Sequence, residues 1–311
     1  MPNPVLTAPT YAGEFAGKYI SAALLSASTL DNGLITIMPN VKYKSVIQTG
    51  SFSSPLIKDS TCNFDTSGGT LTLAEKVITP KQLQVNLQLC KADLENSWEA
   101  EQMGYSAFDN LAPSFEKYVL AYTAAKVADK IESNIWEGAD ADEGEFAGFS
   151  DLLDADADVV DVTGTTVDAT NCIAEMGKVI DAINAQVYGK EDLMLYVSAN
   201  IARAYIRQLG GYGASGLGAN GINNQGTTWF TNGALSFDGI PVVVAKGLGS
   251  NKMVAAQKSN LFFGTGLLND TNEVKVLDMS DLDGSRNVRV IMRFSAGVQT
   301  GIGSDIVWYR S

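Results

Sequence analysis

Residues 108–136 read FDNLAPSFEKYVLAYTAAKVADKIESNIW, which is the longest helical pattern in the chain. Apolar residues recur in it every three or four positions, as one buried face of a helix requires. Pro113 lies near its start, so the regular helix can begin there, with proline in the first turn. A helix of this length would run roughly 40 Å. The pattern therefore predicts a spine along an elongated body, at about residues 106–137, rather than one helix of a compact bundle.

The segment before this helix has the character of a long β-hairpin. Residues 34–38 and 41–47 read as two short strands, and strand character returns at residues 70–73. Between them lies a polar stretch rich in Ser, Thr and Gly, from Gly50 to Thr70. We expect a hairpin that projects from the body. The alternative is an ordinary surface loop of about 20 residues, although loops of that length are uncommon without a function.

Four further segments complete the N-terminal half. Residues 1–12 contain three prolines and read as an extended arm. Residues 11–28 and 91–104 have helical spacing. Residues 83–89 alternate between apolar and polar side chains, as a strand with one buried face does.

The C-terminal half predicts a compact mixed lobe followed by β structure. Helical patterns and apolar strand-like runs alternate at residues 171–187, 193–197, 199–209, 240–244 and 253–256. A glycine-rich loop interrupts them after Gly210. Apolar residues then recur at period two in three segments, at residues 274–276, 288–294 and 306–308. We expect these last strands to share a sheet with the strand at residues 82–90, so that the compact lobe is inserted into an elongated one.

Composition excludes several kinds of chemistry. The chain has 311 residues, of which 35 are acidic, 22 are basic and none is histidine, giving a net charge of −13. Without histidine, Ser-His-Asp and Cys-His catalysis and histidine-ligated metal or haem sites are excluded. The negative charge also argues against broad electrostatic binding of nucleic acid.

The acidity is concentrated in one segment. Residues 137–161 hold ten acidic residues and no Lys or Arg, which leaves 25 acidic residues against 22 basic ones elsewhere. We therefore expect an exposed acidic connection just after the spine helix, on a nearly neutral body.

No motif specifies a catalytic, cofactor or metal site. Residues 216–221 match the spacing of a dinucleotide-binding loop but follow a helix rather than a strand. Residues 154–161 alternate like a calcium loop but lack its turn glycine and its glutamate. We predict no catalytic residue, no cofactor, no metal and no enzymatic activity. A carboxylate-based hydrolase or lyase is the alternative from the enzyme class.

The cysteines and the apolar runs bear on the cellular context. Cys62, Cys90 and Cys172 are widely spaced and odd in number, which is typical of reduced thiols rather than of a disulfide framework. The N-terminus lacks the basic and apolar regions of a signal peptide. No apolar run approaches the about 18 residues that span a bilayer, so we predict no membrane partner.

The order of these parts resembles the major capsid proteins of tailed bacteriophages, which have the Hong Kong 97-type, or Johnson, fold. The most telling strings are DGIPVVV at residues 238–244, KSNLFFG at residues 258–264 and the ending DIVWY at residues 305–309. The resemblance covers nearly the whole chain. It implies an α+β fold with an N-arm, an E-loop hairpin, a P-domain made of a long spine helix and a β-sheet, and an inserted mixed α/β A-domain.

The resemblance also implies boundaries for these parts. They are an N-arm at residues 1–12, an N-terminal helix and strand at 13–40, an E-loop at 41–74, a P-domain at 75–160 and 266–311, and an A-domain at 161–265 with an axial loop at about 211–226. Arm, hairpin and axial loop are the parts expected to contact neighbouring subunits. The contact candidates in them are Pro4, Val5, Tyr43, Lys44, Phe52, Leu56, Lys58, Tyr212, Leu217 and Asn220.

By the same resemblance, the chain is expected to assemble as hexamers and pentamers into the icosahedral shell of a tailed phage. The implied partners are other copies of itself, a separate scaffolding protein, a portal at one vertex, and packaged double-stranded DNA held without sequence-specific binding. Decoration proteins are compatible with it. The implied location is the virion capsid, after assembly in the cytoplasm of the bacterial host. The alternatives are an encapsulin-type nanocompartment shell and another phage structural protein, such as a tail or decoration component.

Overall fold

A computed structural model provides the coordinates of the chain. It describes residues 28–41, 43–52, 57, 59–60, 62, 70–90, 113–209, 235–266, 274–279 and 283–311. The predicted helices at residues 11–28 and 91–104, the arm and the axial loop lie mostly or wholly outside these residues.

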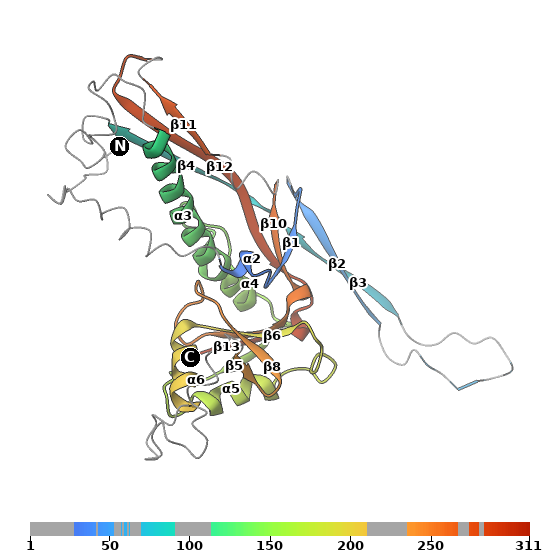
Figure 1. Cartoon of the computed structure of the whole chain (residues 1–311). Coiled ribbons are helices and arrows are strands. Elements are labelled where there is room, and N and C mark those ends of the chain that lie inside the picture. The colour runs from blue at the N-terminus through green and yellow to red at the C-terminus, as the bar shows by residue number, and fades with distance from the viewer. Residues whose placement is uncertain are drawn as a thin grey trace.

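The spine predicted from residues 106–137 is present as one long helix. Helix α3 spans Pro113–Glu137, with the proline in its first turn as expected. It runs along one face of an elongated sheet, and a compact lobe lies beyond its C-terminal end (Figure 1). A short helix, α2 (Ser28–Asp31), packs beside it.

The elongated sheet is built around one long central strand. Its members are β1 (Thr36–Met38), β4 (Lys81–Cys90), β10 (Leu261–Thr265), β11 (Val274–Asp278) and β12 (Asn287–Thr300). Strand β4 pairs antiparallel along one edge of β12, whereas β10 and β11 pair along the other edge. The predicted union of the strands near residues 82–90, 274–276 and 288–294 is therefore confirmed.

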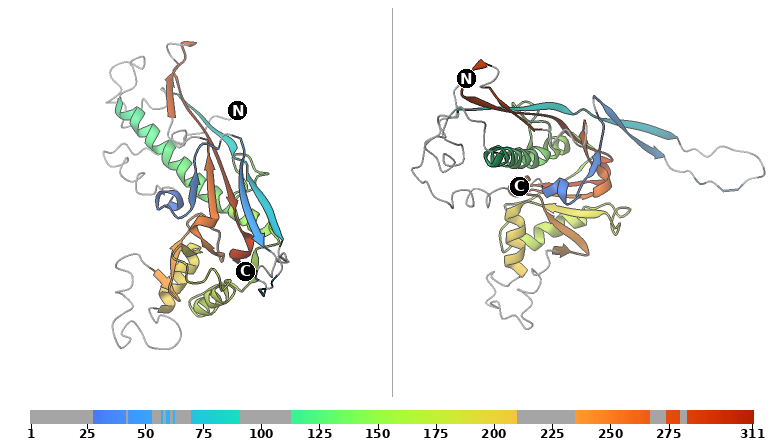
Figure 2. Two further views of the ribbon diagram at one scale, coloured as in Figure 1. Left: turned by 90° about the vertical axis from the view of Figure 1, so that its right-hand side faces the viewer. Right: turned by 45° about the horizontal axis from the view of Figure 1, so that its top comes forward.

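The compact lobe is a six-stranded mixed sheet with helices packed against it (Figure 2). Its strand order is β5 (Val160–Thr163), β13 (Val307–Arg310), β9 (Met253–Gln257), β6 (Leu193–Val197), β8 (Ile240–Val244) and β7 (Leu235–Phe237). Helices α5 (Cys172–Asp181) and α6 (Ala199–Leu209) contribute buried apolar side chains to the same core.

The predicted place of the last strand is wrong. We expected residues 306–308 to join the elongated sheet, but β13 lies in the compact lobe between β5 and β9. Ile306 and Trp308 follow a period of two, which predicts a strand with one buried face. Val307 and Tyr309 are just as fully buried, so this strand is covered on both faces. A strand covered on both faces carries no alternation that would identify its sheet.

Two other local expectations need correction. The helix expected at residues 171–187 ends at Asp181, and a turn follows in which Asn184 accepts the Val187 N–H at 2.8 Å. The acidic connection also contains an unpredicted helix, α4 (Phe149–Ala155), whose Phe149 and Leu153 are buried.

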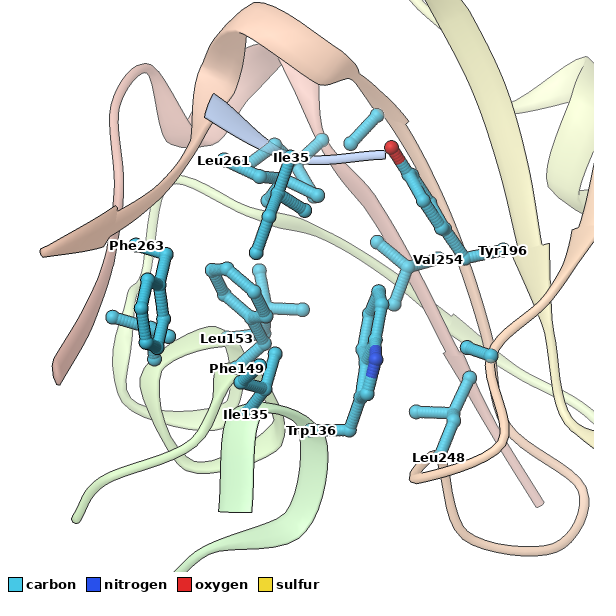
Figure 3. Packing of buried hydrophobic residues seen from close by; sticks show 14 of the residues in the cluster. Ile35, Ile135, Trp136, Phe149, Leu153, Tyr196, Leu248, Val254, Leu261 and Phe263 are labelled. Atoms are coloured by element: carbon cyan, nitrogen blue, oxygen red, sulfur yellow. The ribbon is translucent and has the colours of Figure 1, made fainter. Parts of the chain in front are cut away.

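The two lobes share a hydrophobic core at the end of the spine. Trp136 of α3 lies with its ring centroid 5.4 Å from Phe149 of α4 and 5.3 Å from Tyr196 of β6 (Figure 3). Around them pack Leu261 and Phe263 of β10, from the elongated sheet. The lobes are therefore joined by packing as well as by chain connections.

Candidate assembly surface

The hairpin predicted from the sequence is a two-stranded ribbon that extends away from the body (Figure 1). Strands β2 (Ser45–Phe52) and β3 (Leu71–Ile78) pair antiparallel over eight residues, from Ser45 opposite Ile78 to Phe52 opposite Leu71. No third strand joins them among the described residues. An isolated two-stranded ribbon is at best marginally stable in water.

One face of this ribbon carries four exposed apolar side chains. Residues directly opposite in an antiparallel pair lie on the same face, so Val46 shares a face with Val77, and Leu71 and Leu73 follow at period two. The exposed fractions of these four side chains are 47% for Val46, 38% for Val77, 53% for Leu71 and 70% for Leu73. We call them the apolar ribbon face. The pair Gln48–Glu75 lies between Val77 and Leu73 on this face, so the apolar side chains sit at its two ends. Exposed apolar side chains grouped on one face mark interaction surfaces.

The base of the ribbon is fixed to the body. Ile78 is fully buried, and the Val77 carbonyl accepts a hydrogen bond from the Gln299 side chain at 3.1 Å. The Lys76 ammonium donates to Asp156 at 2.5 Å and to the Thr300 hydroxyl at 3.2 Å. The ribbon therefore leaves the body in a defined direction.

The ion pair at the ribbon base alters the acidity of its carboxyl group. Burial raises the pKa of Asp156, but hydrogen bonds from Lys76 and from the Asp158 N–H outweigh burial and hold that pKa below its usual value. Asp156 is therefore a carboxylate at neutral pH and binds Lys76 as an ion pair.

Only part of the predicted contact set lies on described residues. Tyr43 is 75% exposed before β2, and the Lys44 ammonium lies 5.4 Å from its ring centroid. Phe52 closes the pairing of β2 at the far end of the ribbon. The other candidates fall outside the described residues, namely Pro4, Val5, Leu56, Lys58, Tyr212, Leu217 and Asn220.

Sequence reasoning missed the apolar ribbon face. The signal was present, because Leu71, Leu73 and Val77 recur at even spacing in an otherwise polar segment. The strand was recognised, but the side to which its apolar residues point depends on what lies beneath the ribbon. In the structure no described element covers that side, as the exposed fractions of its side chains show.

The acidic segment is more than an exposed connection, contrary to our expectation. Six of its ten carboxylates form ion pairs with bases of the same chain. The pairs are Glu137–Lys252, Asp140–Lys81, Glu145–Lys130, Asp156–Lys76, and Asp154 and Asp161 with Arg310. Apart from Lys130 of α3, these bases lie far away in the sequence, and together they belong to both lobes. The segment therefore connects the lobes electrostatically.

Glu137 is the most connected of these carboxylates. Its Oε1 accepts the Ser150 hydroxyl at 2.7 Å and the Gly249 N–H at 3.0 Å. Its Oε2 accepts the Lys252 ammonium at 2.6 Å, and that ammonium also lies 5.7 Å from the centroid of the Trp308 ring. Glu137 thus ties the end of α3 to α4 and to the loop between β8 and β9.

The buried acidic and thiol side chains Glu132 and Cys172 have structural rather than catalytic surroundings. Buried Glu132 accepts hydrogen bonds from both the N–H and the hydroxyl of Thr29, at 3.0 and 2.5 Å, so it holds α2 against the spine. Burial raises the pKa of the Cys172 thiol to about 12, which makes it a poor nucleophile. Within the described residues no group of three or more acidic or thiol side chains has the arrangement of a metal site. Among the described helices, none combines the length and apolar character needed to cross a bilayer.

Comparison with known proteins gives a result for structure but not for sequence. No model of a protein family matches the chain, and no curated protein matches it. The chain is similar in structure to the capsid of a native GTA particle, with a TM-score of 0.61 at 15% identity over 98% of this chain and 95% of that one. It is similar to the capsid of the Myoviridae phage XM1, with a TM-score of 0.57 at 12% identity over 99% and 95%.

A third solved structure extends this likeness to another group of phages. The capsid of the cyanophage P-SCSP1u matches with a TM-score of 0.55 at 12% identity, over 98% of this chain and 92% of that one. The likeness spans both lobes, the spine helix and the ribbon, because nearly the whole chain is covered in each case. The expected α+β architecture is thus confirmed, and the chain has the Hong Kong 97-type fold of phage capsid proteins.

Proposed function

We propose that this chain is a major capsid protein, which assembles as hexamers and pentamers into the icosahedral shell around the double-stranded DNA of a tailed bacteriophage. The fold that it shares with phage and GTA capsids supports the proposal. The main support from the chain itself comes from the ribbon. The ribbon exposes apolar side chains that no described part of its own subunit buries.

The free energy of burying the apolar ribbon face favours contact with a neighbouring subunit. Fully burying a Leu or Val side chain contributes about 1.5–3 kcal/mol, so covering the apolar ribbon face would supply several kcal/mol per subunit. A monomer gains nothing from this surface. A shell in which each subunit covers the ribbon of its neighbour gains it at every contact.

The parts of the fold are assigned accordingly. We propose the arm at residues 1–12, the E-loop at 41–74, the P-domain at 75–160 and 266–311, and the A-domain at 161–265. The location of β13 in the compact lobe argues for moving the last strand to the A-domain. We further propose that a separate scaffolding protein and a portal act in assembly, and that the shell forms in the bacterial cytoplasm and resides in the virion. The solved P4 procapsid includes a size determination protein, which offers a precedent for such a partner.

The test is particle formation by the purified chain, with a scaffolding protein supplied if needed. Electron microscopy and sedimentation velocity should show capsomers or closed shells. The paired change Leu71→Ser and Leu73→Ser should abolish them, while the unfolding free energy of the free subunit stays nearly constant because both side chains are exposed in it.

A neighbouring position offers a matched control. Ala74, which pairs with Thr49, lies on the other face of the ribbon. Ala74→Ser should therefore leave assembly intact. A chain that stays monomeric under all conditions would contradict the proposal. Shells that enclose a cargo enzyme instead of DNA would favour a nanocompartment over a virion.

A further inference from the structure

A second exposed surface lies on the elongated sheet, on the side away from α3. Its side chains come from the outward positions of β4 and β12, which pair directly across the two strands. We call it the amide–arginine face. It consists of Gln82, Gln84, Asn86 and Gln88 on β4 and Arg289, Ile291, Arg293 and Ser295 on β12.

The side chains on the two faces of these strands differ in their exposure. On the side of α3, Val288, Val290 and Phe294 of β12 are buried. On the other side all four amides of β4 and both arginines are exposed. A groove is lined by residues 82–84 and 293–295 of the two strands, which include Gln82, Gln84, Arg293 and Ser295 of this face.

The composition of this face is that of a protein interface and not of a solvated surface. Residues 82–88 and 289–295 contain no Lys, Asp or Glu, and Lys275 of the neighbouring strand β11, which pairs with Ile291, lies at the border of this face. Interfaces are depleted in those residue types and enriched in arginine, because strongly hydrated charges are costly to cover. Amide side chains can both donate and accept, so a covering protein can satisfy them.

The groove offers hydrogen-bond donors to an anion. The Ser295 hydroxyl accepts the Gly266 N–H at 2.8 Å, which leaves its own hydrogen to donate outward. Arg293 forms no ion pair with any residue in the described part of the chain. Arg289 donates to Gln88 at 3.1 Å and has Asp283 in its vicinity, so of the two arginines on this face Arg293 is the one without a carboxylate among the described residues.

The chain has carboxylates available for this role, but on another surface. Asp142 and Glu143 are exposed on the turn after α3 and form no ion pair among the described residues. That turn is held on the helix side of the sheet, because Asp140 binds Lys81, which lies opposite buried Ala296. The sheet separates these carboxylates from Arg293 within one subunit. A second copy can bring the two charges together.

We propose that the amide–arginine face is an interface that receives a carboxylate-bearing surface of a second copy of this chain. The inference rests on the proposed function, since it assigns a partner surface within the assembly. A net charge of −13 makes identical subunits repel one another. A face without acidic side chains on β4 and β12, whose Arg293 has no carboxylate partner in the described part of the chain, offsets that repulsion at one defined contact. There the planar guanidinium can bind a carboxylate by two parallel hydrogen bonds.

The test measures the reactivity of Arg293 before and after assembly. Wild-type subunits and purified assemblies are treated with phenylglyoxal, and modification of each arginine is quantified by mass spectrometry. Arg293 should be modified in free subunits and protected several-fold in assemblies that contain no nucleic acid. Protection that appears only when DNA is added would overturn the inference, because the partner would then be a polyanion.

Matched variants supply a second measurement. Arg293→Glu should raise the subunit concentration needed for assembly about tenfold or more, as loss of one interfacial charge pair does. Arg203→Glu changes the charge equally at an exposed site on α6 and should have little effect. Equal unfolding midpoints of the free subunits show that neither variant is misfolded.

The outcomes separate this inference from the proposed function. Absence of any oligomer overturns both. Assemblies in which Arg293 stays fully reactive, or which Arg293→Glu forms as readily as the wild type, overturn only the interface.

Discussion

Glu137 is an acidic residue at a helix terminus that disfavours acids. The C-terminus of a helix carries partial negative charge, so Lys, Arg or His are the usual residues there. The last turn of α3 contains no basic residue, and Glu137 ends the helix instead. Its three hydrogen-bond donors come from α4 and from the loop that contains Gly249 and Lys252. The local penalty is therefore offset by contacts that fix the two lobes relative to each other.

Removing this carboxylate should weaken the junction between the lobes. Glu137→Ala is expected to lower the unfolding free energy by roughly 1–3 kcal/mol, because three donors lose their acceptor. Chemical denaturation of the free subunit measures the loss. Glu143→Ala removes an exposed carboxylate a few residues away and serves as the control. Equal stability of the two variants would show that Glu137 has no role at the junction.

Two glycines give a contrasted prediction at the same scale. A Cβ on Gly247 would lie 2.0 Å from the Glu132 carbonyl oxygen, so Gly247→Ala should destabilise the subunit by about 2 kcal/mol or more. A Cβ on Gly177, within α5, would meet no atom within 4 Å. Gly177→Ala should therefore stabilise by about 0.5–1 kcal/mol, since alanine favours the helix. Thermal unfolding of the two variants should move in opposite directions. A stable Gly247→Ala subunit would mean that the loop near Glu132 is not tightly packed.

At the scale of elements, an ion pair between distant parts of the sequence is one of the contacts that hold the ribbon base. Lys76 at the base of β3 binds Asp156, which follows α4. Replacing the ammonium by a methyl thioether in Lys76→Met should raise the pKa of Asp156, because burial, which raises it, would lose its main opposing contact. Carbon NMR of the carboxyl group during an acid titration measures the change. Lys246→Met, at an exposed position on the loop after β8, should leave the Asp156 titration unaltered.

For the whole molecule, the absence of histidine predicts an unusual pH profile. No side chain with an ordinary pKa near 6.5 is present, so stability should be nearly constant from about pH 6 to pH 8. The pKa values of Asp156, Glu145 and Asp192 are lowered in the folded state by hydrogen bonds that outweigh burial. Lowered carboxyl pKa values contribute stability that is present above the unfolded values and lost as pH falls through the folded ones. Unfolding midpoints should therefore decline only below the ordinary values of 4.5 for Glu and 3.8 for Asp. A transition centred between pH 6 and pH 7 would contradict this account.

The sequence predicted those parts of the fold that depend on local patterns. The spine and the hairpin were visible because α3 keeps helical spacing over 25 residues and the strands β2 and β3 flank a polar stretch. The location of β13 and most ion pairs of the acidic segment were not, because they depend on contacts between segments that lie far apart in the sequence. The apolar ribbon face was missed for a related reason. Exposure depends on what surrounds a strand, and a strand pattern alone does not contain that information.

The location of β13 also governs the timing of folding. Residues 307–310 lie between β5 and β9, so the sheet of the compact lobe stays divided until residue 310 has left the ribosome. Synthesis of the spine and the ribbon is complete well before that point. Nascent chains stalled before residue 307 should therefore remain protease-sensitive in the compact lobe, whereas chains stalled with that strand outside the tunnel should be resistant. Chains that end before residue 307 would lack a native compact lobe. Only subunits translated past that strand would therefore be able to assemble.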